Sequence, residues 1–185
     1  MKNFFLLLTF ILTATLLSAQ NAQYTAAMTK AVTALDSAKT PTDFQAAANT
    51  FSRIAAAEPA EWLPLYYAAF GHLNTAFPMF EQDPAKATLI LDLAQASLDK
   101  AKTLAPQESE LAVMQAYILI GRLMENPMAK GAEITPQVFG ELGKAAALNP
   151  ENPRAAFLHG TYVLNMPAFY GGGAANAKPH FEKAA

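Results

Sequence analysis

Four stretches of the chain repeat one pattern of apolar and small residues. They are AANTFSRIAAAEP (residues 47–59), AQASLDKAKTLAP (94–106), VFGELGKAAALNP (138–150) and AKPHFEKAA (177–185). A large apolar residue stands four positions after the first residue of each stretch, and another apolar residue follows three positions later. Offsets of four and three place side chains on one face of an α-helix, and a proline ends that helix. The three complete copies end in Pro59, Pro106 and Pro150, so the pattern predicts amphipathic helices with a fixed stop.

A second apolar stretch follows each complete copy. The three are EWLPLYYAAFGHLNTAF, SELAVMQAYILIGRLM and PRAAFLHGTYVLNM, and each has a small residue ten positions after its proline: Ala69, Ala116 and Gly160. Small residues at equivalent positions allow two helix backbones to approach closely. The repeated pattern therefore predicts an all-α fold, an α-solenoid of about four antiparallel helical hairpins. We expect one domain over residues 21–185, with repeats at about 22–59, 60–106, 107–150 and 151–185, the last of them truncated.

This arrangement resembles the tetratricopeptide repeat (TPR), which has a small residue in its first helix, an Ala-x3-aromatic pattern in its second and a closing proline. Leu65, Ala112 and Ala156 stand where that family has tryptophan. The prolines are also 47 and 44 residues apart, since they stand at 59, 106 and 150, whereas the family period is about 34. A HEAT-like repeat is the structural alternative. We expect the extra residues in three inter-helix loops, around 78–83, 125–134 and 167–173.

The first twenty residues, MKNFFLLLTFILTATLLSAQ, predict a secretory signal peptide. An apolar run from Phe4 to Leu17 follows Lys2, and Ser18 and Ala19 are small. The run has about 14 residues, which is short for a membrane span of about 20. We expect an exported protein, periplasmic or secreted, without a membrane span once the signal is removed; an uncleaved anchor is the alternative. The sequence contains no cysteine, which excludes disulfides and a lipid-modified N-terminal cysteine.

Charge and composition exclude one class of partner. The formal net charge is −2, and only 15% of the residues are charged. Nucleic-acid-binding proteins meet the phosphate backbone with clustered Lys and Arg, so we expect no nucleic-acid partner.

Three consecutive glycines, Gly171, Gly172 and Gly173, precede the last repeated stretch. A phosphate-binding loop would need a preceding buried strand and a Gly-Lys-Ser/Thr ending, and the chain has neither. We expect the glycines to form a turn with positive φ that starts a helix at close approach. Binding of an anion at that helix N-terminus is the alternative.

The sequence does not indicate an enzyme. His72, His159 and His180 include no i, i+4 pair that would place two metal ligands on one helix face. No Gly-x-Ser-x-Gly motif is present, and the carboxylates, Glu110 among them, are scattered as on a solvated face. We expect no catalytic site, no cofactor and no metal, with each histidine packed structurally.

Two surfaces are candidates for binding. Helical spacing along the first helices predicts an aromatic groove on the concave side, formed by Tyr66, Phe70, Val113, Tyr117, Arg154, Phe157, Thr161 and Asn165. The three inter-helix loops share proline, methionine and aromatic residues, which predicts a loop-edge surface formed by Phe77, Met79, Phe80, Met124, Met128, Met166, Phe169 and Tyr170. Either set could instead fill space between neighbouring helices or under the loops.

We expect an exported, non-catalytic scaffold or adaptor that binds a protein or peptide partner. The alternative is a periplasmic ligand-binding accessory subunit of a transport system, whose ligand would be an apolar small molecule or lipid-like. The last helix ends without a proline or a polar capping helix, so we expect the chain to be a fragment of a longer protein.

Overall fold

The computed structural model describes residues 22–185. The predicted signal peptide, residues 1–20, lies outside the described residues. Every regular element in residues 22–185 is a helix. Residues 22–36 are helical and are followed by α2 (Pro41–Ala57), α3 (Leu63–Ala76), η1 (Phe77–Glu81), α4 (Pro84–Leu104), α5 (Ser109–Glu125), α6 (Pro127–Leu148), α7 (Pro153–Asn165), η2 (Ala168–Tyr170) and α8 (Ala174–Ala184).

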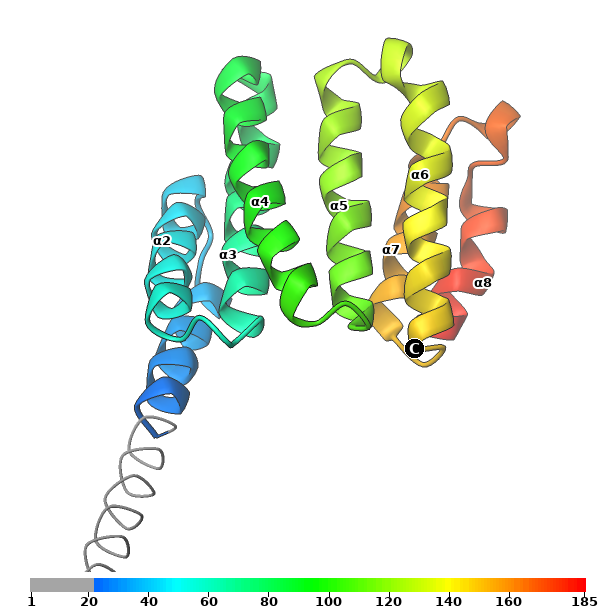
Figure 1. The fold of residues 1–185 in the computed structure, drawn as a ribbon. Helices are drawn as coiled ribbons and strands as arrows, with labels where there is room; N and C mark the ends of the chain where they lie inside the picture. The colour runs from blue at the N-terminus through cyan, green and yellow to red at the C-terminus, as the bar shows by residue number, and fades with distance from the viewer. Residues whose placement is uncertain (1–21) are drawn as a thin grey trace, which may run out of the picture.

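The helices form antiparallel hairpins that stack side by side (Figure 1). The helix over residues 22–36 pairs with α2, and the later hairpins are α3 with α4, α5 with α6, and α7 with α8. The first helices also touch one another, α3 against α5 and α5 against α7. This confirms the predicted α-solenoid of about four hairpins. None of the helices in residues 22–185 is both long enough and apolar enough to cross a membrane.

Polar caps and prolines define where the helices begin. Thr40 and Asp43 form a reciprocal capping box at the start of α2, and Asp83, Asn126 and Asn152 cap α4, α6 and α7. A proline occupies the first position of each of these four helices, where its missing N–H costs nothing.

The repeat prolines mark the helix ends as expected. Helices α2, α4 and α6 end two residues before Pro59, Pro106 and Pro150 respectively. Two of the three expected loops are present, around 78–83 and 167–173, and they contain the short helices η1 and η2. The second was predicted wrongly, because residues 127–134 are helical and belong to α6, which has 22 residues.

Pro136 explains this error. It stands inside α6, although an interior proline removes one backbone hydrogen bond. Both Pro136 and Ala132, whose carbonyl loses its partner, lie on the exposed side of the helix. Water can therefore satisfy that carbonyl, and the helix continues.

The repeated positions supply the core. Phe51, Leu98 and Leu142 are buried, as are Ala69 and Ala116. A Cβ on Gly160 would lie 2.8 Å from the Phe181 ring, so this glycine allows α8 to approach α7 closely. The residues that the sequence pattern selected thus hold neighbouring helices together.

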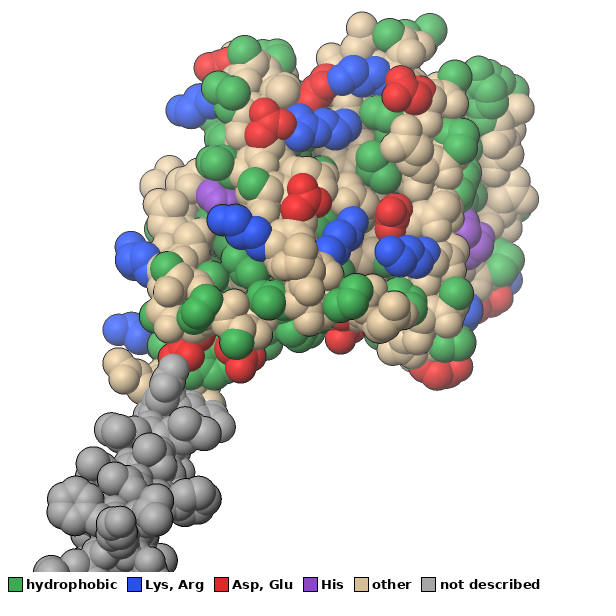
Figure 2. All heavy atoms as spheres, viewed as in Figure 1, with side chains coloured by type: hydrophobic (Ala, Val, Ile, Leu, Met, Phe, Trp, Pro, Cys, Tyr) green, Lys and Arg blue, Asp and Glu red, His purple; other side chains and the backbone are tan. Residues whose placement is uncertain are grey.

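The outer face carries mixed charge. Figure 2 shows positive and negative side chains interspersed over α4, α5 and α6. Arg122 of α5 pairs with Asp92 of α4 and with Glu125, and Glu125 also binds Lys130. This face offers no basic stripe for a phosphate backbone.

The glycine run forms the predicted turn. Gly171 and Gly173 have φ of +85° and +108°, values that favour glycine. Gly172 provides the close approach, because a Cβ there would lie 1.9 Å from the Met166 carbonyl oxygen. The Gly173 N–H donates to the Val163 carbonyl and so ties the turn to α7.

Replacing Gly172 by alanine should lower the free energy of unfolding by about 1–3 kcal/mol, because the backbone at Met166 must move. The matched control is Gly143→Ala in α6, where a Cβ meets nothing within 4 Å. Alanine there should stabilise the helix by up to about 1 kcal/mol. Urea denaturation measures both changes, and equal effects of the two variants would contradict this view of the turn.

Candidate functional site

Equivalent residues of successive hairpins meet on the concave side. Tyr66, Val113 and Phe157 each stand seven residues after a repeat proline. They lie on α3, α5 and α7, the first helices of their hairpins. Phe70 and Tyr117 follow one helical turn later and present the same face. Stacking of the hairpins thus converts a repeated sequence position into a continuous surface.

This surface is hollowed into a groove with a cavity of about 250 Å³. Its lining consists of Tyr66, Phe70, Val113, Met114, Tyr117, Arg154, Phe157 and Leu158. Six of these eight residues belong to the groove predicted from helical spacing; their role in binding stays a prediction.

Two predicted groove residues lie outside the cavity, and two lining residues were missed. The Thr161 hydroxyl and the Asn165 amide hydrogen-bond to backbone carbonyls of their own helix, those of Phe157 and Thr161. Met114 and Leu158 each follow directly after a correctly predicted residue. Whether such a residue lines the groove depends on the rotation of its helix about the helix axis, and the repeat spacing does not determine that rotation.

The aromatic side chains that line the groove contact other aromatic rings. Tyr66 makes edge contacts with Trp62 and Tyr67, at ring-centroid distances of 6.1 and 5.3 Å. Tyr117 makes an edge contact with Phe77 at 6.3 Å, and Phe157 lies 5.8 Å from Phe181. Such contacts restrict ring rotation, so the groove is preformed.

A carboxylate at one end of the groove joins three hairpins. Glu110 of α5 accepts a hydrogen bond from the Tyr66 hydroxyl of α3 at 3.3 Å and pairs with the Arg154 guanidinium of α7 at 3.2 Å. Its other oxygen accepts from the Asn152 amide at 3.1 Å. Asn152 also donates to Ser109, whose hydroxyl donates to the Ala145 carbonyl of α6.

The sequence did not reveal this role of Glu110, which was expected on a solvated face. Only 20% of its side chain is exposed, against 66% for Arg154. The partner Tyr66 lies 44 positions away in the chain, and no local pattern connects the two. The result is a half-buried carboxylate with an exposed arginine at the groove edge.

The two tyrosines of the groove stay neutral at ordinary pH. Burial, reinforced by the nearby Glu110 carboxylate, raises the pKa of Tyr66 above its usual value. Burial alone raises the pKa of Tyr117. Their hydroxyl groups are therefore protonated at pH 7 and can donate hydrogen bonds. Arg154 is the one charged side chain among the eight residues that line the cavity.

The loop-edge surface divides into two parts. Phe77, Met79 and Phe80 pack against the core around α3 and α4, and Met166 packs against the core of α5 and α6. The other four residues are exposed: Met124, Met128, Phe169 and Tyr170. The first part fills space under a loop, and only the second offers contact area.

The histidines differ in their surroundings. His72 is buried in α3, and its Nδ1 has no hydrogen-bond partner among the described residues; burial lowers its pKa. His159 and His180 are in contact, which their sequence spacing did not predict. The antiparallel pairing of α7 and α8 brings them together.

Removing the Glu110 carboxylate should lower stability. Glu110→Ala removes the acceptor of the Tyr66 hydroxyl and one of the two acceptors of the Asn152 amide, which should cost about 1–3 kcal/mol of unfolding free energy. The matched control is Glu133→Ala, an exposed position within α6 that should change little. Urea denaturation gives both values, and similar small losses would contradict a joining role for Glu110.

Fold and groove together define a class, an all-helical repeat protein whose first helices form one preformed apolar groove with an arginine at its edge. The chain is similar to the solved structure of the HusA haemophore from Porphyromonas gingivalis, with 35% sequence identity and a TM-score of 0.78. The similarity covers 87% of this chain and 78% of the haemophore. The chain belongs to the same family as that haemophore. No protein-family model and no curated protein sequence matches it.

Proposed function

We propose that this protein is an exported, non-catalytic binding protein that takes up a flat, largely apolar ligand with carboxylate groups, and that this ligand is haem. The observation that carries the proposal is the groove itself, with aromatic rings from three helices and one exposed arginine. Membership in the family of a haemophore supports the choice of haem. The sequence analysis gave two possible functions, a protein scaffold and a subunit that binds an apolar small molecule. We prefer the second.

The lining suits a macrocycle of this kind. Tyr66, Phe70, Tyr117 and Phe157 supply ring faces and edges, which pack well against a flat aromatic ligand. Val113, Met114 and Leu158 add apolar surface without polar groups that would have to be desolvated. The binding energy would come mainly from apolar contact.

Arg154 gives the groove its orientation. One guanidinium nitrogen is engaged by Glu110, and the side chain is mostly exposed, so its other N–H groups can bind a ligand carboxylate. In this arrangement Glu110 holds the arginine in place and the arginine fixes the carboxylate edge of the ligand.

The lining contains few groups that could bind the iron. It offers two phenols, Tyr66 and Tyr117, and the thioether of Met114, and it contains no histidine. Both phenols are protonated at pH 7, so either would have to release its proton to bind iron as a phenolate. Binding that depends mainly on contacts with the macrocycle would suit a protein that carries haem and releases it.

The predicted export and the predicted TPR-like repeats agree with this proposal. With both, the protein would be a periplasmic or secreted helical-repeat carrier. A role as the ligand-binding accessory subunit of a transport system is compatible with it, because a carrier must pass its ligand on.

Haemin titration followed by absorbance tests the groove. Tyr117→Ala and Phe157→Ala should each weaken haemin binding about tenfold, since each removes a ring from the lining. Phe169→Ala is the matched control, because this phenylalanine is 80% exposed and lies outside the groove. If Phe169→Ala weakened binding while the two groove variants bound normally, the groove would not be the site.

The same titration with haemin dimethyl ester tests Arg154. Wild-type protein should prefer haemin to the ester, and Arg154→Ala should abolish that preference with a loss of about tenfold for haemin. The matched control, Arg53→Ala on the exposed side of α2, should keep the preference. A preference that survives in Arg154→Ala would contradict the assigned role.

A further inference from the structure

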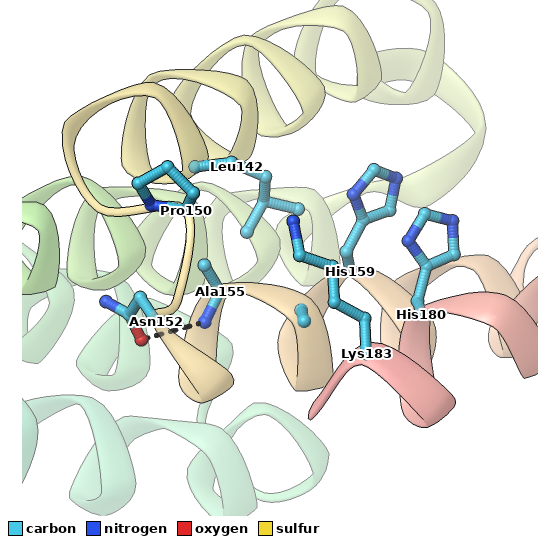
Figure 3. A pocket seen from close by; sticks show the side chains of 9 residues that line it. Leu142, Pro150, Asn152, Ala155, His159, His180 and Lys183 are labelled. Carbon is cyan, nitrogen blue, oxygen red and sulfur yellow. Dashed lines mark hydrogen bonds between the residues drawn. The ribbon is translucent and has the colours of Figure 1, made fainter. Parts of the chain in front are cut away.

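Two imidazole rings are stacked between the last two helices. His159 of α7 and His180 of α8 have ring centroids 3.8 Å apart and planes inclined by 20°. Figure 3 shows the rings side by side, pointing the same way from neighbouring helices. His159 also packs against Phe139 of α6, at a centroid distance of 5.3 Å. The contact between α7 and α8 therefore contains two titratable groups that lie face to face.

The stacked rings cannot share a proton. A hydrogen bond between imidazoles needs the N–H of one ring to point, in its own plane, at a lone pair of the other, and the two planes here are nearly parallel. A proton on each ring would place two positive charges on rings 3.8 Å apart, with no hydrogen bond between them. Like charges so close together repel, so a second proton opposes the stack.

No negative charge compensates for these protons. The small cavity beside the rings is bordered by Lys183 of α8 and by uncharged residues, which include Leu142 and Ala146 of α6. No ion pair within residues 22–185 joins a carboxylate to either imidazole or to Lys183. Protonated rings would therefore add their charge to that of a nearby lysine.

The charged residues of the adjoining helix segments interact elsewhere. Glu182 of α8 pairs with Lys178, and both side chains are mostly exposed. On α6, Glu141 and Lys144 act on Lys102 of α4. None of these side chains borders the cavity beside the histidines.

Protonation of His159 is disfavoured while α8 is docked on α7. Burial, followed by the influence of His180, lowers the pKa of His159 below its ordinary value of 6.5. If α8 opened, the ring would be solvated and its pKa would return toward that value. Between the two values the opened state binds more protons, so acid favours opening. Docking of α8 is therefore strongest above pH 6.5 and weakens as the pH falls below it.

The same helix contact supports one side of the groove. Phe181 directly follows His180, and its ring lies 5.8 Å from that of Phe157, which lines the groove. A Cβ on Gly160, directly after His159, would lie 2.8 Å from the Phe181 ring. Any movement of α8 away from α7 would thus remove the ring against which Phe157 packs.

We propose that the stacked histidines form a pH-sensitive switch, which loosens α8 from α7 in acid and thereby releases the ligand from the groove. Two protonated rings repel each other across the helix contact, α8 moves away, and Phe157 loses its support. Ligand release rests on the proposed function, because it needs a ligand in the groove. The loosening of α8 is a property of the ligand-free protein.

Hydrogen exchange of ligand-free protein at pH 7.5 and pH 5.5 tests the loosening. Protection factors remove the direct effect of pH on the exchange rate. In wild-type protein those of the α8 amides should fall about fivefold at pH 5.5, within the limit of about tenfold per pKa unit, and those of α5 should change little. His180→Gln and His159→Gln each remove one proton acceptor, and each should reduce the fall to about twofold or less.

His72→Gln is the matched control. His72 is the third histidine of the chain, and burial lowers its pKa too, but it lies on α3. The fall in protection of the α8 amides should be the same in this variant as in wild-type protein.

Haemin titration at the same two pH values tests the release. Quenching of the single tryptophan, Trp62, follows binding in dilute solution. His180→Gln should bind haemin as wild-type protein does at pH 7.5. Between pH 7.5 and pH 5.5 the wild-type affinity should fall about threefold further than that of His180→Gln. Protonation of the ligand carboxylates affects both proteins equally and cancels in this comparison.

Two results would overturn the proposal. One is an equal fall of α8 protection in wild-type protein and in both folded glutamine variants. The other is an equal fall of haemin affinity in wild-type protein and His180→Gln. Failure of haemin to bind wild-type protein at pH 7.5 would instead contradict the proposed function, and hydrogen exchange would still show whether the histidines loosen α8.

Discussion

The groove depends on one carboxylate that three hairpins share. Glu110 of α5 accepts from Tyr66 of α3 and pairs with Arg154 of α7, so it fixes the spacing of the three helices that form the walls. Apolar packing alone holds neighbouring hairpins together but tolerates sliding, whereas hydrogen bonds to a half-buried charge require a defined geometry. The same contact keeps the arginine at the groove edge.

Close helix packing makes this arrangement possible. Ala69 and Ala116 are fully buried, and Gly160 lies against Phe181, so small residues at one repeat position let each second helix approach its first. The larger residues three positions earlier, Tyr66, Val113 and Phe157, are then left to face the concave side. One sequence period thus supplies both the core and the lining of the groove, and the fold leads directly to the groove.

The sequence predicted what is periodic and missed what depends on pairing across hairpins. The repeated apolar positions and prolines predicted the helices, their ends and most of the cavity lining. The helical start of α6 was missed because the helix continues through Pro136. This proline lies on the exposed side of α6, where water can satisfy the backbone carbonyl that it leaves without a partner. The Glu110 contacts and the stacking of His159 on His180 were missed because their partners come from different helices, and only the helix rotation in the folded chain brings them together.

The most direct measurement is a crystal structure of the protein with haemin bound. It should show the macrocycle between the aromatic residues of α3, α5 and α7, with a carboxylate on Arg154 and with Glu110 still bound to Tyr66 and Arg154. Haemin seated on the exposed Phe169 and Tyr170, or against the histidines of α7 and α8, with an empty groove, would contradict this description of the protein.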